Sequence, residues 1–204
     1  AREAADPSMI QFKGRYYIFA SMNLSVWVSD DMANWKSYRL PDNLPLYDYA
    51  PDVRVIGDYV YFSASKREEV CDYYRTKDVI NGPYERIEGT FDFWDPNLFV
   101  DDDGRIYFYW GCANVTPVWG VELDPETMKP LTERKELIWG DAWTKGYERC
   151  GEDHCQPPYT KEEAEMRYQG FLQMRGMKDS ELSDSMRIML RGYMSGDPYI
   201  EGAW

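Results

Sequence analysis

Residues 94–108 have the sequence WDPNLFVDDDGRIYF, and this stretch decides how the whole chain is interpreted. Asp95 precedes an apolar segment, a turn and a second apolar segment. Three other stretches repeat this pattern around an acidic residue: ADPSMIQFKGRYYIF at 5–19, YAPDVRVIGDYVYF at 49–62 and PYIEGAW at 198–204. Their acids are Asp6, Asp52 and Glu201. A strand-turn-strand unit that recurs radially would bring all four carboxylates to one central point.

The spacing of these acids predicts the blades of a β-propeller. The first three acids are 46 and 43 residues apart, as expected for four-stranded blades. Asp95 and Glu201 are 106 residues apart, which indicates an inserted segment. We expect residues 1–204 to form a single partial propeller domain of the all-β class. Its expected parts are three blades at about 4–46, 49–90 and 93–139, an insertion at about 140–197, and the start of a fourth blade at 198–204.

Apolar and aromatic runs bounded by turn residues predict the individual strands. The expected strands lie at 9–12, 16–19, 25–29, 98–100, 106–109 and 118–123. Three consecutive aspartates at 101–103 resemble a calcium loop, but they lack the spaced ligands of an EF-hand. We therefore expect a hairpin turn there.

The insertion has a helical pattern and not the alternation of a strand. Thr160 and Glu163 form a capping box, and Ala164, Tyr168, Phe171 and Leu172 follow on one helix face. A second helix is expected from about Asp179, with Gly176 in the turn between the helices. Its apolar side would carry Leu182, Met186, Met189, Leu190 and Tyr193. The resulting helical hairpin, at about 160–195, is either a packed decoration or oligomer contact at the rim, or a lid over a site.

Composition restricts the partners of this chain. Aromatic residues make up 16% of it, with 17 Tyr and 8 Trp, and they either pack between blades or stack on sugar rings. A formal net charge of −13 excludes nucleic acid and anionic membranes as expected partners, since no basic stripe is present. The sequence has neither a transmembrane run nor a signal peptide, and its compartment is left open.

The four cysteines do not predict a metal site. Cys71, Cys112, Cys150 and Cys155 show no C-x-x-C pairing, and the chain has one histidine, so a zinc site is not expected. Cys150 and Cys155 flank a short polar segment and could form a local disulfide, a question that their spacing leaves open. We expect no cofactor.

The phrases around Asp6, Asp95 and Glu201 together resemble the signature of glycoside hydrolase family 43. The resemblance implies a five-bladed propeller and inverting hydrolysis of arabinofuranosides, xylosides or related plant-wall glycosides. It implies Asp6 as general base, Asp95 as the residue that tunes the acid's pKa, and Glu201 as general acid. An inverting pair of carboxyl groups is roughly 6.5–9.5 Å apart, so that a water fits between one of them and the sugar.

The chain also departs from the family pattern. A five-bladed domain needs roughly 300 residues, so about three and a half blades are expected here. A second copy or a companion chain would then complete the propeller, or the chain is part of a longer enzyme that carries the remaining blades. The late-blade histidine that often lies near a central metal has no match, since His154 falls in the insertion. A central calcium in the complete ring is left open, with no ligand identifiable in this sequence.

Other residues are predicted to contact an oligosaccharide or polysaccharide substrate. Asp52 would bind a sugar hydroxyl or, equally well, cap the turn of its own strand. Aromatic rings beside the acids would line or stack in the pocket, namely Tyr49, Trp94 and Trp204. Glu148 and Arg149 lie in a polar, glycine-bearing run and would reach the substrate. The rival interpretation is a carbohydrate-binding or inactive propeller fragment that keeps the pocket without turnover.

Overall fold

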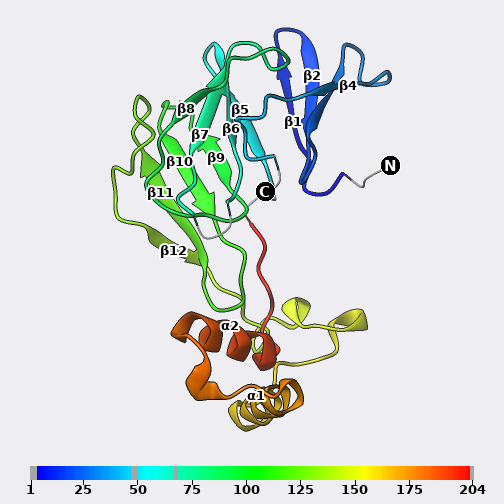
Figure 1. Cartoon of the computed structure of the whole chain (residues 1–204), viewed down its shortest axis with the longest axis vertical. Coiled ribbons are helices and arrows are strands. Elements are labelled where there is room, and N and C mark those ends of the chain that lie inside the picture. The colour runs from blue at the N-terminus through cyan, green and yellow to red at the C-terminus, as the bar shows by residue number, and fades with distance from the viewer. Residues whose placement is uncertain (1–3, 47–49, 67–68, 203–204) are drawn as a thin grey trace. The chain divides into compact units, whose positions relative to one another are not determined.

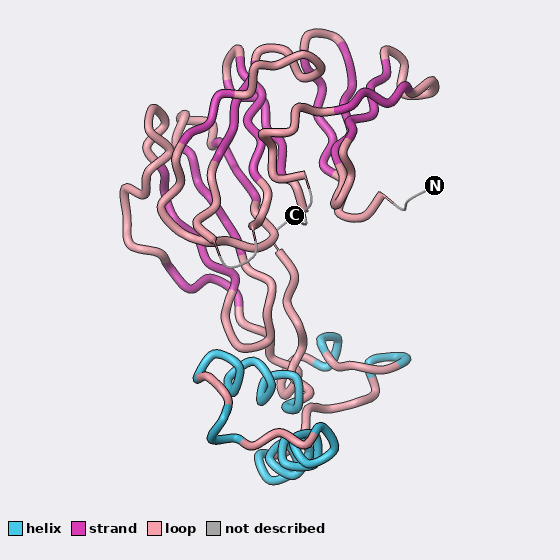
Figure 2. Tube along the Cα trace, in the orientation of Figure 1, coloured by secondary structure: helices cyan, strands magenta, loops and turns pink. Residues whose placement is uncertain are grey.

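The computed structural model describes residues 4–46, 50–66 and 69–202 (Figures 1 and 2). The chain divides into two compact units. The first contains Ala1–Gly111, Val118–Glu136 and Gly202–Trp204, and the second contains Cys112–Pro117 and Leu137–Glu201. None of the helices in the described ranges is long and apolar enough to cross a membrane.

Three four-stranded antiparallel sheets build the first unit, each from consecutive strands. The first sheet contains β1 (Ser8–Phe12), β2 (Arg15–Phe19), β3 (Ser25–Ser29) and β4 (Lys36–Arg39). The second contains β5 (Asp52–Ile56), β6 (Tyr59–Ser63), β7 (Tyr73–Thr76) and β8 (Glu85–Ile87). The third contains β9 (Asn97–Val100), β10 (Ile106–Trp110), β11 (Val118–Leu123) and β12 (Lys135–Ile138). Strands are present at all six predicted locations, and each sheet has the meander of a propeller blade.

Local sequence explains the strands and their turns. In β1, Ile10 and Phe12 are buried whereas Met9 and Gln11 are exposed, which is the period-2 pattern of a half-buried strand. Lys13 and Gly14 connect β1 to β2, and both have a positive φ, as a two-residue hairpin turn requires. The aspartates at 101–103 lie in the turn between β9 and β10, where Asp101 N–H donates to Arg105 O at 2.9 Å. The predicted hairpin turn is therefore confirmed.

Two hydrophobic cores lie between neighbouring sheets. The first joins the first and second sheets, and the second joins the second and third sheets. Strand β6 serves both cores, because Val60 and Phe62 belong to the first and Tyr61 to the second. A strand buried on both faces needs a continuous apolar run, and the YVYF sequence of β6 is such a run.

A helical hairpin forms part of the second unit. Helix α1 (Lys161–Arg175) begins at Thr160, which makes the predicted capping box with Glu163. It ends at Gly176, whose left-handed φ of 64° is the usual end of a helix. Tyr168 and Leu172 pack with Leu182 in a small core.

The second helix starts later than predicted. Helix α2 (Asp184–Ser195) begins after Ser183, whose Oγ accepts a hydrogen bond from Met186 N–H, and residues 179–181 form a separate 3₁₀ turn. The predicted apolar side is also divided. Leu182 and Leu190 pack in the small core, whereas Met186, Met189 and Tyr193 are 41%, 44% and 50% exposed. A helical period in the sequence therefore did not mean burial along the whole face.

The second core provides a test of the sheet packing. Phe108 has no exposed surface, and its ring lies 4.8 Å from that of Phe93 and 5.4 Å from that of Tyr73. We expect Phe108→Ala to lower the free energy of unfolding by about 3–5 kcal/mol, because it leaves a cavity between two sheets. Urea unfolding of the full-length protein measures this loss. The control is Met32→Ala in the turn between β3 and β4, where the side chain is 52% exposed and the expected loss is about 1 kcal/mol or less. Equal losses would contradict this core.

Candidate active site

Asp6 and Asp95 occupy equivalent positions in the first and third sheets. Each lies two residues before the first strand of its sheet and is followed by a proline. Both have a left-handed backbone, with φ of 49° at Asp6 and 48° at Asp95. Residues other than glycine seldom adopt this conformation, and such strained residues cluster at functional sites. The same backbone geometry therefore presents both carboxylates.

Asp52 does not share that position, and the sequence-based alignment was wrong here. Asp52 is the first residue of β5, as Ser8 is of β1 and Asn97 is of β9. The residue equivalent to Asp6 and Asp95 is Ala50, which precedes Pro51 and has a φ of 53°. An alignment on the three prolines, and not on the acids, would have found this register.

Asp52 instead links the second sheet to the third. It is 3% exposed, and its Oδ2 accepts a hydrogen bond of 2.6 Å from the backbone N–H of Leu98 in β9. Arg54 lies 3.2 Å from Asp52 Oδ1 and donates to Leu98 O at 2.8 Å. Ser8 makes the same link one sheet earlier, since its Oγ accepts from Val53 N–H at 3.1 Å. The hydrogen bond of Asp52 is thus made to the next sheet and not to its own turn, and its contact with a sugar stays a prediction.

Burial dominates the ionisation of Asp52. It raises the pKa of this carboxyl to about 6, against the attraction of Arg54 and the donors Leu98 N–H and Val53 N–H, which lower it. Asp52 therefore titrates closer to neutrality than an exposed aspartate.

Asp6 is half-buried, and its carboxylate accepts a hydrogen bond from a serine. Ser21, two residues beyond the end of β2, donates from Oγ to Asp6 Oδ2 at 2.5 Å. Ser21 is not among the residues that the sequence predicts for the site. A serine at the end of a strand carries no distinguishing signal, and only the fold brings it to Asp6, 15 residues earlier in the chain.

Asp95 is joined to the last of the four acidic stretches. It is 8% exposed, and its Oδ2 accepts a hydrogen bond of 3.1 Å from Gly202 N–H, 107 residues later. A Cβ atom at position 202 would lie 2.4 Å from Asp95 Cβ and 2.6 Å from Asp95 O. Only glycine fits this close approach, which explains the residue that follows Glu201 in the E-G pair.

Glu201 directly precedes Gly202 and is exposed. It follows Ile200, which pairs with Ala113 through two backbone hydrogen bonds of 3.0 and 3.1 Å in the second unit. These bonds hold the segment that leads to Glu201. The predicted roles of Asp6, Asp95 and Glu201 in catalysis stay predictions.

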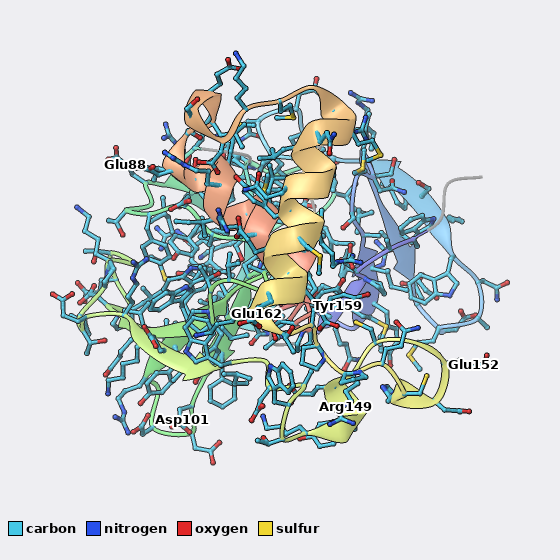
Figure 3. All side chains as sticks on the ribbon, turned by 90° about the horizontal axis from the view of Figure 1, so that it is seen from below. Glu88, Asp101, Arg149, Glu152, Tyr159 and Glu162 are labelled. Carbon is cyan, nitrogen blue, oxygen red and sulfur yellow. The ribbon has the colours of Figure 1, made fainter. Side chains whose placement is uncertain are left out.

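The other residues predicted to contact substrate form hydrogen bonds within the protein or lie outside the described ranges. Trp94 is half-buried, and its C=O accepts from Gly111 N–H at 2.9 Å. Glu148 accepts from Asp141 N–H at 2.6 Å, and Arg149 donates to Ala142 O at 2.9 Å, so both brace their own loop (Arg149 is labelled in Figure 3). Their contact with substrate stays a prediction. Tyr49 and Trp204 lie outside the described residues.

A metal site built from protein side chains needs several ligands close together within the described ranges. No group of three or more His, Cys, Asp or Glu side chains there could hold a metal ion. Cys150 and Cys155 do not form the disulfide that their spacing left open, and the other two cysteines of the described ranges are not in a disulfide either.

Comparison with known sequences decides the family. The profile described as "Glycosyl hydrolases family 43" matches residues 1–151. The chain belongs to this family. A curated relative, xylosidase/arabinosidase 43A of Humicola insolens, is 28% identical over 153 residues, which covers 58% of this chain and 45% of the relative. The family 43 chain thus spans about half the length of this relative.

Solved structures agree on the fold. An exo-1,5-α-L-arabinanase from a bovine ruminal metagenomic library has a TM-score of 0.52 and 24% identity, over 67% of this chain and 55% of that one. An arabinanase of Bacillus subtilis has a TM-score of 0.53 and 20% identity, over 68% of this chain and 58% of that one. These similarities confirm the predicted fold class, a partial β-propeller with an inserted helical hairpin.

The pKa of Asp52 gives a testable pH dependence. Between pH about 4 and about 6 the folded protein retains a proton on Asp52 that the unfolded chain has released, so this residue lowers stability as the pH rises. The slope is at most about 1.4 kcal/mol per pH unit. Asp52→Asn removes the titrating carboxyl and with it this contribution to the free energy of unfolding. We therefore expect the unfolding free energy of the unmodified protein, minus that of the variant, to decrease from pH 4 to 6 and then to level off. Urea unfolding at each pH measures this difference, and an increase with pH would contradict the assignment.

Proposed function

We propose that the protein containing this chain is an inverting glycoside hydrolase that acts on arabinofuranosides, xylosides or related plant-wall glycosides. Asp6 is the general base, Glu201 the general acid and Asp95 the carboxylate that keeps Glu201 protonated. Membership of family 43 and the names of the relatives support this class of substrate. The alternative is a carbohydrate-binding or inactive propeller fragment, which would bind the same class of sugar without hydrolysing it.

The observation that carries the proposal is the contact between Asp95 and Gly202. Two of the acidic stretches that resemble the family signature, 107 residues apart, meet through Gly202 N–H and Asp95 Oδ2. The close approach excludes any side chain at position 202. Glu201 is the covalent neighbour of Gly202, so its backbone is only one peptide unit, ~3.8 Å between Cα atoms, from a residue that touches Asp95.

Each acid has a separate task in this mechanism. Asp6 accepts a proton from the water that attacks the anomeric carbon, while Glu201 donates a proton to the leaving oxygen. An ionised Asp95 disfavours a second negative charge nearby, which favours the protonated form of Glu201. Asn and Gln replacements test the two proton-transfer tasks separately.

The proposal includes completion of the propeller by further protein. Exposed apolar side chains remain on the strands of the first and third sheets, including Met9 at 53% and Phe99 at 46% exposure. Covering such surface contributes about 25 cal/mol for each Å² of apolar area. The rest of the parent protein, a companion chain or a second copy would supply this cover.

The base is tested by Asp6→Asn in the full-length protein. An amide cannot accept the water's proton, so we expect kcat on an aryl arabinofuranoside or xyloside to fall at least about 100-fold. Asp102→Asn, at an exposed turn position, is the control and should keep its activity. Near-normal turnover by Asp6→Asn would exclude this assignment, and an unmodified full-length protein that binds sugar without turnover would favour the alternative.

The acid is tested by the dependence of Glu201→Gln on the leaving group. Activated phenolates leave without protonation, whereas natural glycosides need a proton donor. We expect Glu201→Gln to lose about 100-fold or more on natural glycosides and far less on nitrophenyl glycosides. Steady-state kinetics on both substrate classes measure the ratio. Equal losses on both would show that Glu201 is not the proton donor.

A further inference from the structure

The side chain of Ser21 bridges Asp6 and the backbone of Ala50, two residues before β5. Ser21 is 7% exposed, and its backbone N–H donates to Ala5 O at 2.9 Å. Its Oγ accepts from Ala50 N–H at 2.6 Å and donates to Asp6 Oδ2 at 2.5 Å. A backbone N–H can only donate and an ionised carboxylate can only accept. The Ser21 hydroxyl proton is therefore directed at Asp6.

The third sheet shows the same site without this hydroxyl. Gly111 takes the place of Ser21, since its N–H donates to Trp94 O at 2.9 Å just as Ser21 N–H donates to Ala5 O. The carboxylate of Asp95 then accepts directly from a backbone N–H, that of Gly202. At Asp6 the hydroxyl of Ser21 stands between the carboxylate and a backbone N–H, that of Ala50.

We propose that Ser21 is a positioning residue for the general base. The inference rests on the proposed function of Asp6. The hydroxyl binds Oδ2 and fixes the rotation of the carboxylate, whereas Oδ1 accepts no hydrogen bond from any residue in the described part of the chain. Oδ1 is thereby left to accept the proton of the attacking water. Ser21 is itself held by Ala5 and Ala50, which lie in the segments before β1 and β5, so these two segments fix the position of the hydroxyl that binds Asp6.

Kinetics of Ser21 variants in the full-length protein test this role. Removing a hydrogen bond to a charged group is expected to reduce kcat about 10- to 100-fold in Ser21→Ala. KM should stay within about twofold, because Ser21 is buried and its hydroxyl is bonded to Asp6 and Ala50. Ser21→Thr keeps the hydroxyl and should restore most of the turnover. Urea unfolding of each variant shows whether it is folded.

A matched control exists in the same sheet. Ser29 is also buried, and its Oγ donates to Asp31 Oδ1 at 3.0 Å and accepts from Met32 N–H at 2.9 Å. Ser29→Ala removes an equivalent serine-aspartate bond away from the proposed base, so its kcat should be unchanged. Equal losses of kcat in Ser29→Ala and Ser21→Ala would overturn the inference, because the effect would then be structural.

The double variant Ser21→Ala/Asp6→Asn measures whether the two residues act together, and it does not depend on Ser21→Thr being folded. If Ser21 acts through Asp6, adding Ser21→Ala to Asp6→Asn should lower kcat by less than about twofold further. If the fold-loss of kcat in the double variant equals the product of the two single losses, the residues act independently and the inference is overturned. If Ser21→Ala keeps normal kcat while Asp6→Asn is inactive, the positioning role fails and the proposed function stands. If Asp6→Asn itself remains active, the proposed function fails and the inference with it.

Discussion

The first unit depends on a hydrogen bond that links the first strands of neighbouring sheets, β1 to β5 and β5 to β9. In each case the side chain that begins one strand accepts from a backbone N–H at the start of the next. Ser8 accepts from Val53 N–H, and Asp52 accepts from Leu98 N–H. These bonds set the register between neighbouring sheets, and the two hydrophobic cores fill the space between the sheets. The acids at the strand entrances are positioned by this register, since each lies two residues before the first strand of its sheet.

The candidate site combines strained backbone with close packing. Asp6 and Asp95 both have a left-handed backbone before a proline, a costly conformation that the surrounding structure must hold. Ser21 holds the first carboxylate, and Gly202 N–H binds the second. The donor differs because Gly111 replaces serine in the third sheet. Two carboxylates with similar backbones thus accept hydrogen bonds from different donors.

Much of the fold could be predicted because its signals are local. Alternation in β1, the turn at Lys13 and Gly14, and the capping box of α1 each depend on residues within a few positions of one another. Burial in α2 could not be predicted in the same way. Its helical period was correct, but only packing against α1 decides which apolar side chains are covered, and Met186 and Met189 remain exposed.

The sequence by itself determined the blade-like repeats, the helical hairpin and the resemblance to family 43, because short motifs and their spacing carry that information. Only the tertiary structure decided that Ala50, and not Asp52, is the equivalent of Asp6 and Asp95. It alone made Asp52 a buried link between sheets, brought Ser21 to Asp6, and joined Gly202 to Asp95. The physical reason is that these contacts join residues 15 to 107 positions apart, and their geometry follows from sheet register and packing, which no local pattern encodes.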